Sequence, residues 1–98
     1  MTDAPLPRIE SVKPLPNYRL EVFLMGEGHP FIVSLSDRIA RGGVFSSLRD
    51  PQTFARVRIG ERRRTIYWPK PHDVRGDPVI DIDAESLLAE AERQSALA

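Results

Sequence analysis

Few residues of this chain have the types and spacing that catalysis or metal binding requires. The best candidates are one histidine and the aspartates that follow it: His72, Asp73, Asp77, Asp81 and Asp83. Imidazole and carboxylate groups can together bind a hard metal ion or transfer protons, and Asp81 and Asp83 would share one face of a strand. Their spacing matches no metal-binding motif, however, and a helix cap, a turn and a solvated loop also explain these aspartates. We therefore expect no metal, no cofactor and no enzymatic activity.

Other residues with catalytic potential are explained by turns. Gly26 and Gly28 precede a predicted strand, whereas a phosphate-binding glycine loop opens a helix. Ser46 and Ser47 lack both the context of a nucleophile elbow and an identifiable base. The absence of cysteine excludes disulfides, a thiolate nucleophile and cysteine-ligated zinc. These patterns direct attention from catalysis to binding.

The feature that could bind a partner is a group of arginines around a predicted hairpin. These arginines are followed by two aromatic residues, and the set is Arg56, Arg58, Arg62, Arg63, Arg64, Tyr67 and Trp68. Arginine forks hold carboxylates and phosphates, and an aromatic ring can stack on a base or pack against a protein. Trp68 is the only tryptophan and follows an apolar alternation, so we expect it in the core. A solvated or internally paired face, a protein-binding surface and a nucleic-acid-binding surface all stay open.

Charge is balanced overall but segregated along the chain. The 98 residues include 14 basic and 14 acidic residues. Residues 56–75 carry seven basic and two acidic residues, whereas residues 76–98 carry one basic and six acidic residues. The neutral total lacks the basic footprint of a nucleic-acid-binding protein, and the acidic segment could fold back over the basic one.

Period-2 alternation predicts the strands that position these arginines. Residues 9–15 read as a first extended segment, and residues 18–24 place Tyr18, Leu20, Val22 and Leu24 on one face of a strand. Residues 31–35 return as the second strand of a hairpin. A second hairpin follows, with strands at 57–59 and 65–68 and a turn at 60–63, and residues 79–82 form another short extended segment.

The helices are predicted to be short except for the last. Gly42 and Gly43 end a helix at 37–40, and Asp50 caps a helical turn that begins at Pro51. A final helix follows Asp83, with an apolar stripe of Ala84, Leu87, Leu88 and Ala91. Leu87 and Leu88 either complete the core or dock on a partner, and exposed strand edges could be covered by self-association or by a partner strand.

These elements predict one α+β domain. Its sheet is small, mostly antiparallel and built from two hairpins, with short helices and a C-terminal helix. We expect a flexible N-terminus at residues 1–7, the domain at 8–92 and a frayed C-terminus at 93–98. No segment approaches the roughly 18 apolar residues of a membrane span, and the N-terminus lacks a signal-peptide pattern, so a cytoplasmic location is expected.

Four blocks of residues, in this order, resemble the bacterial family known as domain of unknown function 2442. They are Ile9-x-x-Val12-x-Pro14-x-x-Asn17-Tyr18-x-Leu20, Gly42-Gly43-Val44-Phe45-x-x-Leu48-Arg49-Asp50-Pro51-x-x-Phe54, Thr65-Ile66-x-Trp68-Pro69 and Asp81-Ile82-Asp83-x-x-x-Leu87. The resemblance spans roughly residues 8–90 and implies a small α+β fold without agreed catalytic or binding residues. Members of the family are often encoded beside another very small uncharacterised protein, and this association implies a two-component or toxin–antitoxin-like pairing. The sequence departs from the family after Pro69, where many relatives have Asn-Gly and a shorter loop.

The sequence thus predicts a non-enzymatic interaction module, the partner-binding or antitoxin-like member of a two-protein bacterial system. The predicted partner-binding residues are Arg56, Arg58, Arg62, Arg63, Arg64, Tyr67, Leu87 and Leu88. The expected partner is a small protein encoded nearby, and homo-oligomerisation stays open. The alternative is a regulatory protein that binds nucleic acid with the arginine-rich hairpin. No membrane contact is expected.

Overall fold

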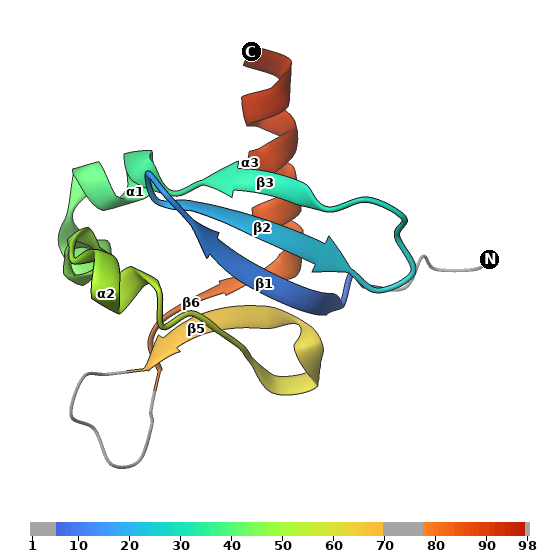
Figure 1. The fold of residues 1–98 in the computed structure, drawn as a ribbon, viewed down its shortest axis with the longest axis horizontal. Helices are drawn as coiled ribbons and strands as arrows, with labels where there is room; N and C mark the ends of the chain where they lie inside the picture. The colour runs from blue at the N-terminus through green and yellow to red at the C-terminus, as the bar shows by residue number, and fades with distance from the viewer. Residues whose placement is uncertain (1–5, 70–77, 98) are drawn as a thin grey trace.

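Two three-stranded antiparallel sheets form the framework of the chain (Figure 1). The computed structural model describes residues 6–69 and 78–97. The first sheet has the order β1 (Ile9–Leu15), β2 (Arg19–Leu24), β3 (Phe31–Ser34), and the second the order β4 (Arg58–Ile59), β5 (Thr65–Pro69), β6 (Pro78–Asp83). The predicted α+β class is confirmed. Each predicted hairpin gains a third strand, so the strands make two sheets where a single small sheet was expected.

The register of the first sheet follows from the alternation in β2. Leu20, Val22 and Leu24 are buried on one face, as predicted, and Leu20 lies opposite Val33 of β3. A tight turn joins β1 to β2 with positive φ angles at both Asn17 (66°) and Tyr18 (60°). Two consecutive left-handed residues are typical of the turns whose twist matches an antiparallel hairpin.

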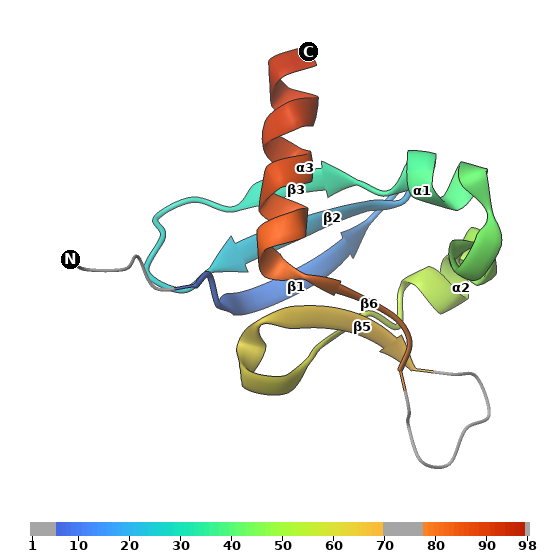
Figure 2. The same cartoon turned by 180° about the vertical axis from the view of Figure 1, so that it is seen from behind.

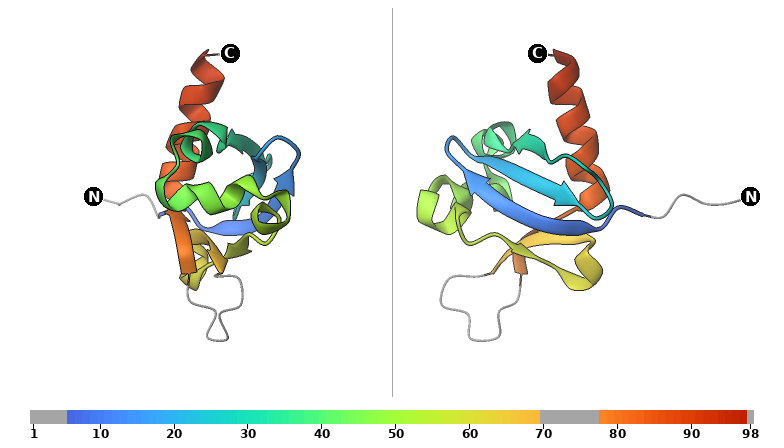
Figure 3. Two further views of the ribbon diagram at one scale, coloured as in Figure 1. Left: turned by 90° about the vertical axis from the view of Figure 1, so that its left-hand side faces the viewer. Right: turned by 45° about the vertical axis from the view of Figure 1, so that its right-hand side comes forward.

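Three short helices connect the two sheets, α1 (Ser36–Arg41), the 3-10 helix η1 (Gly43–Arg49) and α2 (Pro51–Phe54). They gather at one end of the molecule (Figure 3). Gly42 ends α1 with a φ of 84°, and the Asp50 carboxylate accepts a hydrogen bond from the Gln52 amide at 3.1 Å. The predicted glycine stop and aspartate cap are both confirmed. In sequence, these helices stand between the strands of the first sheet and those of the second.

The last helix, α3 (Ala84–Leu97), follows β6 without a loop. It rises from the second sheet, crosses the first and projects beyond β3 (Figures 1 and 2). The Gln94 side chain fixes it there, because its amide oxygen accepts from Ser34 N at 2.8 Å and its nitrogen donates to Ser34 O at 2.9 Å. The helix therefore continues past residue 92, where the frayed terminus was expected to begin.

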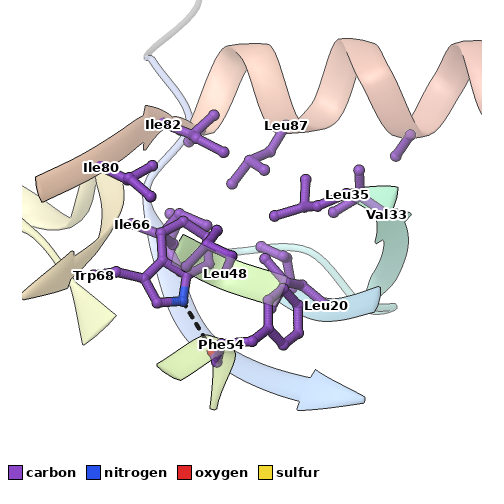
Figure 4. Close-up of a cluster of buried hydrophobic side chains, with 14 of the residues drawn as sticks. Leu20, Val33, Leu35, Leu48, Phe54, Ile66, Trp68, Ile80, Ile82 and Leu87 are labelled. Carbon is purple, nitrogen blue, oxygen red and sulfur yellow. Dashed lines mark hydrogen bonds between the residues drawn. The ribbon is translucent and has the colours of Figure 1, made fainter. Parts of the chain in front are cut away.

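One hydrophobic core joins both sheets and the helices (Figure 4). Trp68 of β5 is 1% exposed, and its indole Nε1 donates a hydrogen bond to the carbonyl oxygen of Phe54 at 2.9 Å. The Phe54 ring lies 6.0 Å from Trp68 and 5.5 Å from Tyr18, centroid to centroid. The prediction that Trp68 belongs to the core is confirmed. Its burial aligns β5 so that the alternate residues of that strand face outward.

Candidate interaction site

The outward face of the second sheet presents a row of three polar side chains. Arg58 lies opposite Tyr67, and Tyr67 lies opposite Asp81. Directly opposed residues of antiparallel strands share a face, and the neighbours Ile66 and Ile82 are buried on the other one. Arg58 and Asp81 are exposed and Tyr67 is half-buried. The register therefore places an aromatic ring between a cation and an anion.

A strained turn forms the tip of the second hairpin. The chain reverses through a short helical turn, η2 (Glu61–Arg63), and the Arg64 amide donates to the carbonyl oxygen of Glu61 at 3.2 Å. Arg62 and Arg63 have φ angles of 56° and 59°, so both central residues are left-handed. Such turns favour Asn and Gly at these positions, because other side chains meet steric resistance there. Arginine at both positions is costly to the fold.

A hollow of about 640 Å³ lies beside this tip on the outward face of the sheet. Its lining residues are Gly60, Glu61, Arg62, Arg64, Thr65, Tyr67 and Asp81. Three of the predicted binding residues, Arg62, Arg64 and Tyr67, are thus brought together. Glu61 and Asp81 were not assigned to this surface from sequence. For Asp81 the only available signal was the alternation of its strand, which does not say what lies beside it.

The five arginines of the predicted set have different roles in the structure. Arg63 donates hydrogen bonds from Nη1 to the carbonyl oxygens of Ile9 (3.2 Å) and Glu10 (3.1 Å), which ties the tip to the edge of β1. Arg64 is half-buried, and its Nε is shielded from solvent without a partner in the described part of the chain. The other three are exposed, namely Arg56, Arg58 and Arg62.

The acidic C-terminal segment does not neutralise the hairpin in the described residues. Across residues 6–69 and 78–97 one ion pair forms, between Arg38 Nε and a Glu90 oxygen at 3.0 Å. It joins α3 to α1. The hairpin arginines therefore make no ion pair with any carboxylate whose position is described.

The two leucines of α3 that were predicted to bind a partner, Leu87 and Leu88, differ in how exposed they are. Leu87 is fully buried in the core, which corrects its assignment to a partner-binding surface. The apolar stripe predicted from sequence is present on α3, but the side chain at its centre packs in the core. Leu88 is half-buried beside the exposed Leu6 and Met25, and these residues line a separate hollow.

Of the candidate metal ligands, Asp81 and Asp83 lie in the described part of the chain. Within the described ranges no three His, Asp or Glu side chains cluster as metal ligands would. Asp83 accepts a hydrogen bond from Ser86 Oγ at 2.6 Å. His72, Asp73 and Asp77 lie outside the described residues.

None of the helices in the described part of the chain combines the length and apolar character needed to cross a membrane.

The family model described as "Protein of unknown function (DUF2442)" matches residues 9–93. The chain belongs to this family. The resemblance inferred from the four sequence blocks is thereby confirmed. No curated protein matches the chain.

A solved structure has the same fold. The crystal structure of "Putative DNA Binding Protein NE0471" from Nitrosomonas europaea ATCC 19718 matches with a TM-score of 0.71 and 23% sequence identity. The match covers 98% of this chain and 56% of that chain. The chain therefore spans about half the length of that protein, and the likeness establishes the fold.

Proposed function

We propose that this DUF2442 domain is a non-enzymatic interaction module that binds an acidic segment of a partner protein. The binding surface is the hairpin face, which we define as Arg58, Arg62, Arg64 and Tyr67. One observation carries the proposal: these arginines have no carboxylate partner among the described residues, while the Glu90 carboxylate of α3 is engaged with Arg38. Acidic side chains of a partner supply the charge that the chain does not provide.

Two further observations favour a protein over a nucleic acid. Glu61 and Asp81 line the same hollow as Arg62 and Arg64, so a continuous phosphate backbone would meet repulsion there. The formal net charge of the chain is zero, whereas nucleic-acid-binding domains carry a basic excess. A protein segment can place single carboxylates beside the arginines and hydrogen-bond donors beside the carboxylates.

Fluorescence anisotropy with a labelled glutamate-rich peptide tests the proposal. The full chain should bind this peptide and should not bind the same peptide with glutamine in place of glutamate. Charge reversal by Arg58→Glu and Arg62→Glu should weaken binding at least about 10-fold. The matched control is Arg41→Glu with Arg93→Glu, which changes the net charge equally at two exposed sites away from the hairpin. Absent binding, or an equal loss in the control, contradicts the proposal.

The partner implied by the family resemblance is a small protein encoded nearby, in an antitoxin-like pairing. The two proteins should co-purify when they are co-expressed. Charge reversal at Arg58 and Arg62 should separate them, whereas the Arg41 and Arg93 control should leave the complex intact. A complex that persists after hairpin charge reversal contradicts the use of this surface.

Nucleic-acid binding is the second candidate function, favoured by two observations. NE0471 carries the name of a DNA-binding protein, and the half-buried Tyr67 beside arginines resembles a stacking platform for bases. Binding of this kind would weaken steeply as salt rises, because phosphate contacts release counterions. Fluorescence anisotropy with duplex and single-stranded DNA at low salt tests this candidate. If the chain binds either DNA more tightly than the glutamate peptide, nucleic-acid binding replaces the binding of an acidic protein segment as the proposed function.

A further inference from the structure

Arg62 adopts a backbone conformation that a hairpin selected only for stability would avoid. Its φ and ψ are 56° and 16°, at the first central position of a turn in which Asn is preferred. An arginine there is strained by contact of its Cβ with the following carbonyl oxygen. Strained residues persist where the surroundings hold them in place, and they concentrate at binding and catalytic sites.

The other non-glycine residues with positive φ in the described chain have local explanations. Asn17 tolerates this conformation. Tyr18 donates a hydrogen bond to the Arg49 carbonyl oxygen at 2.6 Å and packs edge-on against Phe54. Arg63 is held by the carbonyl oxygens of β1.

Arg62 has no such explanation. Its side chain is exposed, lines the hollow, and makes no hydrogen bond or ion pair within the described part of the chain. The Arg62 side chain is therefore exposed on a strained backbone and makes no contact that would stabilise the fold.

Arg64 lines the same hollow, and it also lines a smaller one that includes Asp83 and Glu85. Its main chain is anchored, because the carbonyl oxygen accepts a hydrogen bond from Ala84 N at 2.7 Å. Its Nε is shielded from solvent without an acceptor among the described residues, which is unfavourable in the free protein. Because Nε is shielded, a ligand oxygen would reach this guanidinium at its terminal Nη groups, which donate to no acceptor among the described residues.

We propose that Arg62 and Arg64 together bind a single carboxylate of the partner, from a Glu or Asp side chain, with Tyr67 packing against its aliphatic part. This inference rests on the proposed function and names the group that is recognised. The fork of N–H donors on a guanidinium matches the two oxygens of a carboxylate, and charged hydrogen bonds of this kind are strong. Glu61 and Asp81 line the same hollow, so their negative charges would repel a polyanion more than a single carboxylate that the two arginines neutralise.

Two substitutions at adjacent turn positions separate binding from stability. Arg62→Asn should raise the melting temperature by about 3 °C, because Asn tolerates the left-handed conformation, while weakening the glutamate peptide about 10-fold. Arg63→Asn relieves similar strain but loses two hydrogen bonds to β1, so it should lower the melting temperature and leave peptide affinity within about twofold. Arg64→Gln should weaken the peptide as Arg62→Asn does.

The outcomes distinguish this inference from the proposed function. If the unmodified chain does not bind the glutamate peptide, both fail. If it binds, and Arg58→Glu with Arg62→Glu abolishes binding while Arg62→Asn binds as tightly as the unmodified chain, only the carboxylate site fails. A lower melting temperature for Arg62→Asn overturns the argument from strain. Competition by a single-stranded oligonucleotide as strong as that by the peptide overturns the choice of a carboxylate.

Discussion

The ion pair between Arg38 and Glu90 should couple α3 to the rest of the domain, and the two partners should contribute unequally. Arg38 Nε donates to both Glu90 oxygens, at 3.0 and 3.2 Å. The arginine side chain is 28% exposed and the glutamate 11%. The guanidinium also lies over the Phe45 ring, 5.5 Å from its centroid. Loss of the arginine would therefore leave the more buried charge without a partner.

The expected magnitudes follow from this asymmetry. Arg38→Met retains an apolar side chain against Phe45 but leaves the buried Glu90 carboxylate without its partner. We therefore expect this variant to lose about 3 kcal/mol of unfolding free energy. Glu90→Gln leaves an amide oxygen that still accepts from Arg38, whose guanidinium reaches water, so about 1 kcal/mol should be lost. In a domain of this size each kcal/mol lowers the melting temperature by roughly 4–8 °C.

Urea denaturation followed by Trp68 fluorescence measures these differences, because the only tryptophan is buried in the core. The double variant Arg38→Met with Glu90→Gln closes a thermodynamic cycle, and its coupling free energy should be about 2 kcal/mol. Equal losses in the two single variants would refute the assignment of the greater burial penalty to Glu90. A coupling free energy near zero would refute the ion pair as a contact that stabilises the position of α3.

Two further predictions concern the core and the edge of the first sheet. Trp68→Phe should lower the unfolding free energy by about 2 kcal/mol, because it leaves the buried Phe54 carbonyl oxygen without its donor. Thermal denaturation followed by circular dichroism measures this loss, and a change below about 0.5 kcal/mol would contradict the role of the hydrogen bond. Gln94→Ala should increase hydrogen exchange of the Ser34 amide while leaving that of Val33 nearly unchanged, and unaltered exchange at Ser34 would show that water replaces the side chain equally well.

Much of the fold was predictable because its signals are local. The alternation of β2 and the Asp50-Pro51 helix start need only neighbouring residues, and both were confirmed. The division into two sheets was not predictable, because it depends on how the connecting helices pack into the shared core through Leu48 and Phe54. Likewise, Leu87 and Leu88 share one predicted stripe, and only the tertiary position of α3 decides that Leu87 is buried.

The candidate site shows the same limit. Its arginines and Tyr67 were identified from composition and alternation alone. Their separate roles were not, because Arg63 is bonded to carbonyl oxygens 53 and 54 positions away in the chain. The inclusion of Asp81 depends on the register between β5 and β6, which no local pattern specifies.

The basic and acidic stretches of the sequence do not pair with each other in the described part of the structure. A basic stretch followed by an acidic one suggested mutual neutralisation, yet Glu90 pairs with Arg38, which lies 52 positions earlier in the chain. Asp81, from the acidic stretch, instead joins the hollow beside Arg62 and Arg64. The surface is thus a mixed one in which each described charge lacks an internal partner, and a mixed surface discriminates among partners better than a uniformly basic one. Selective recognition of a protein segment is consequently a better match to this arrangement than general affinity for polyanions.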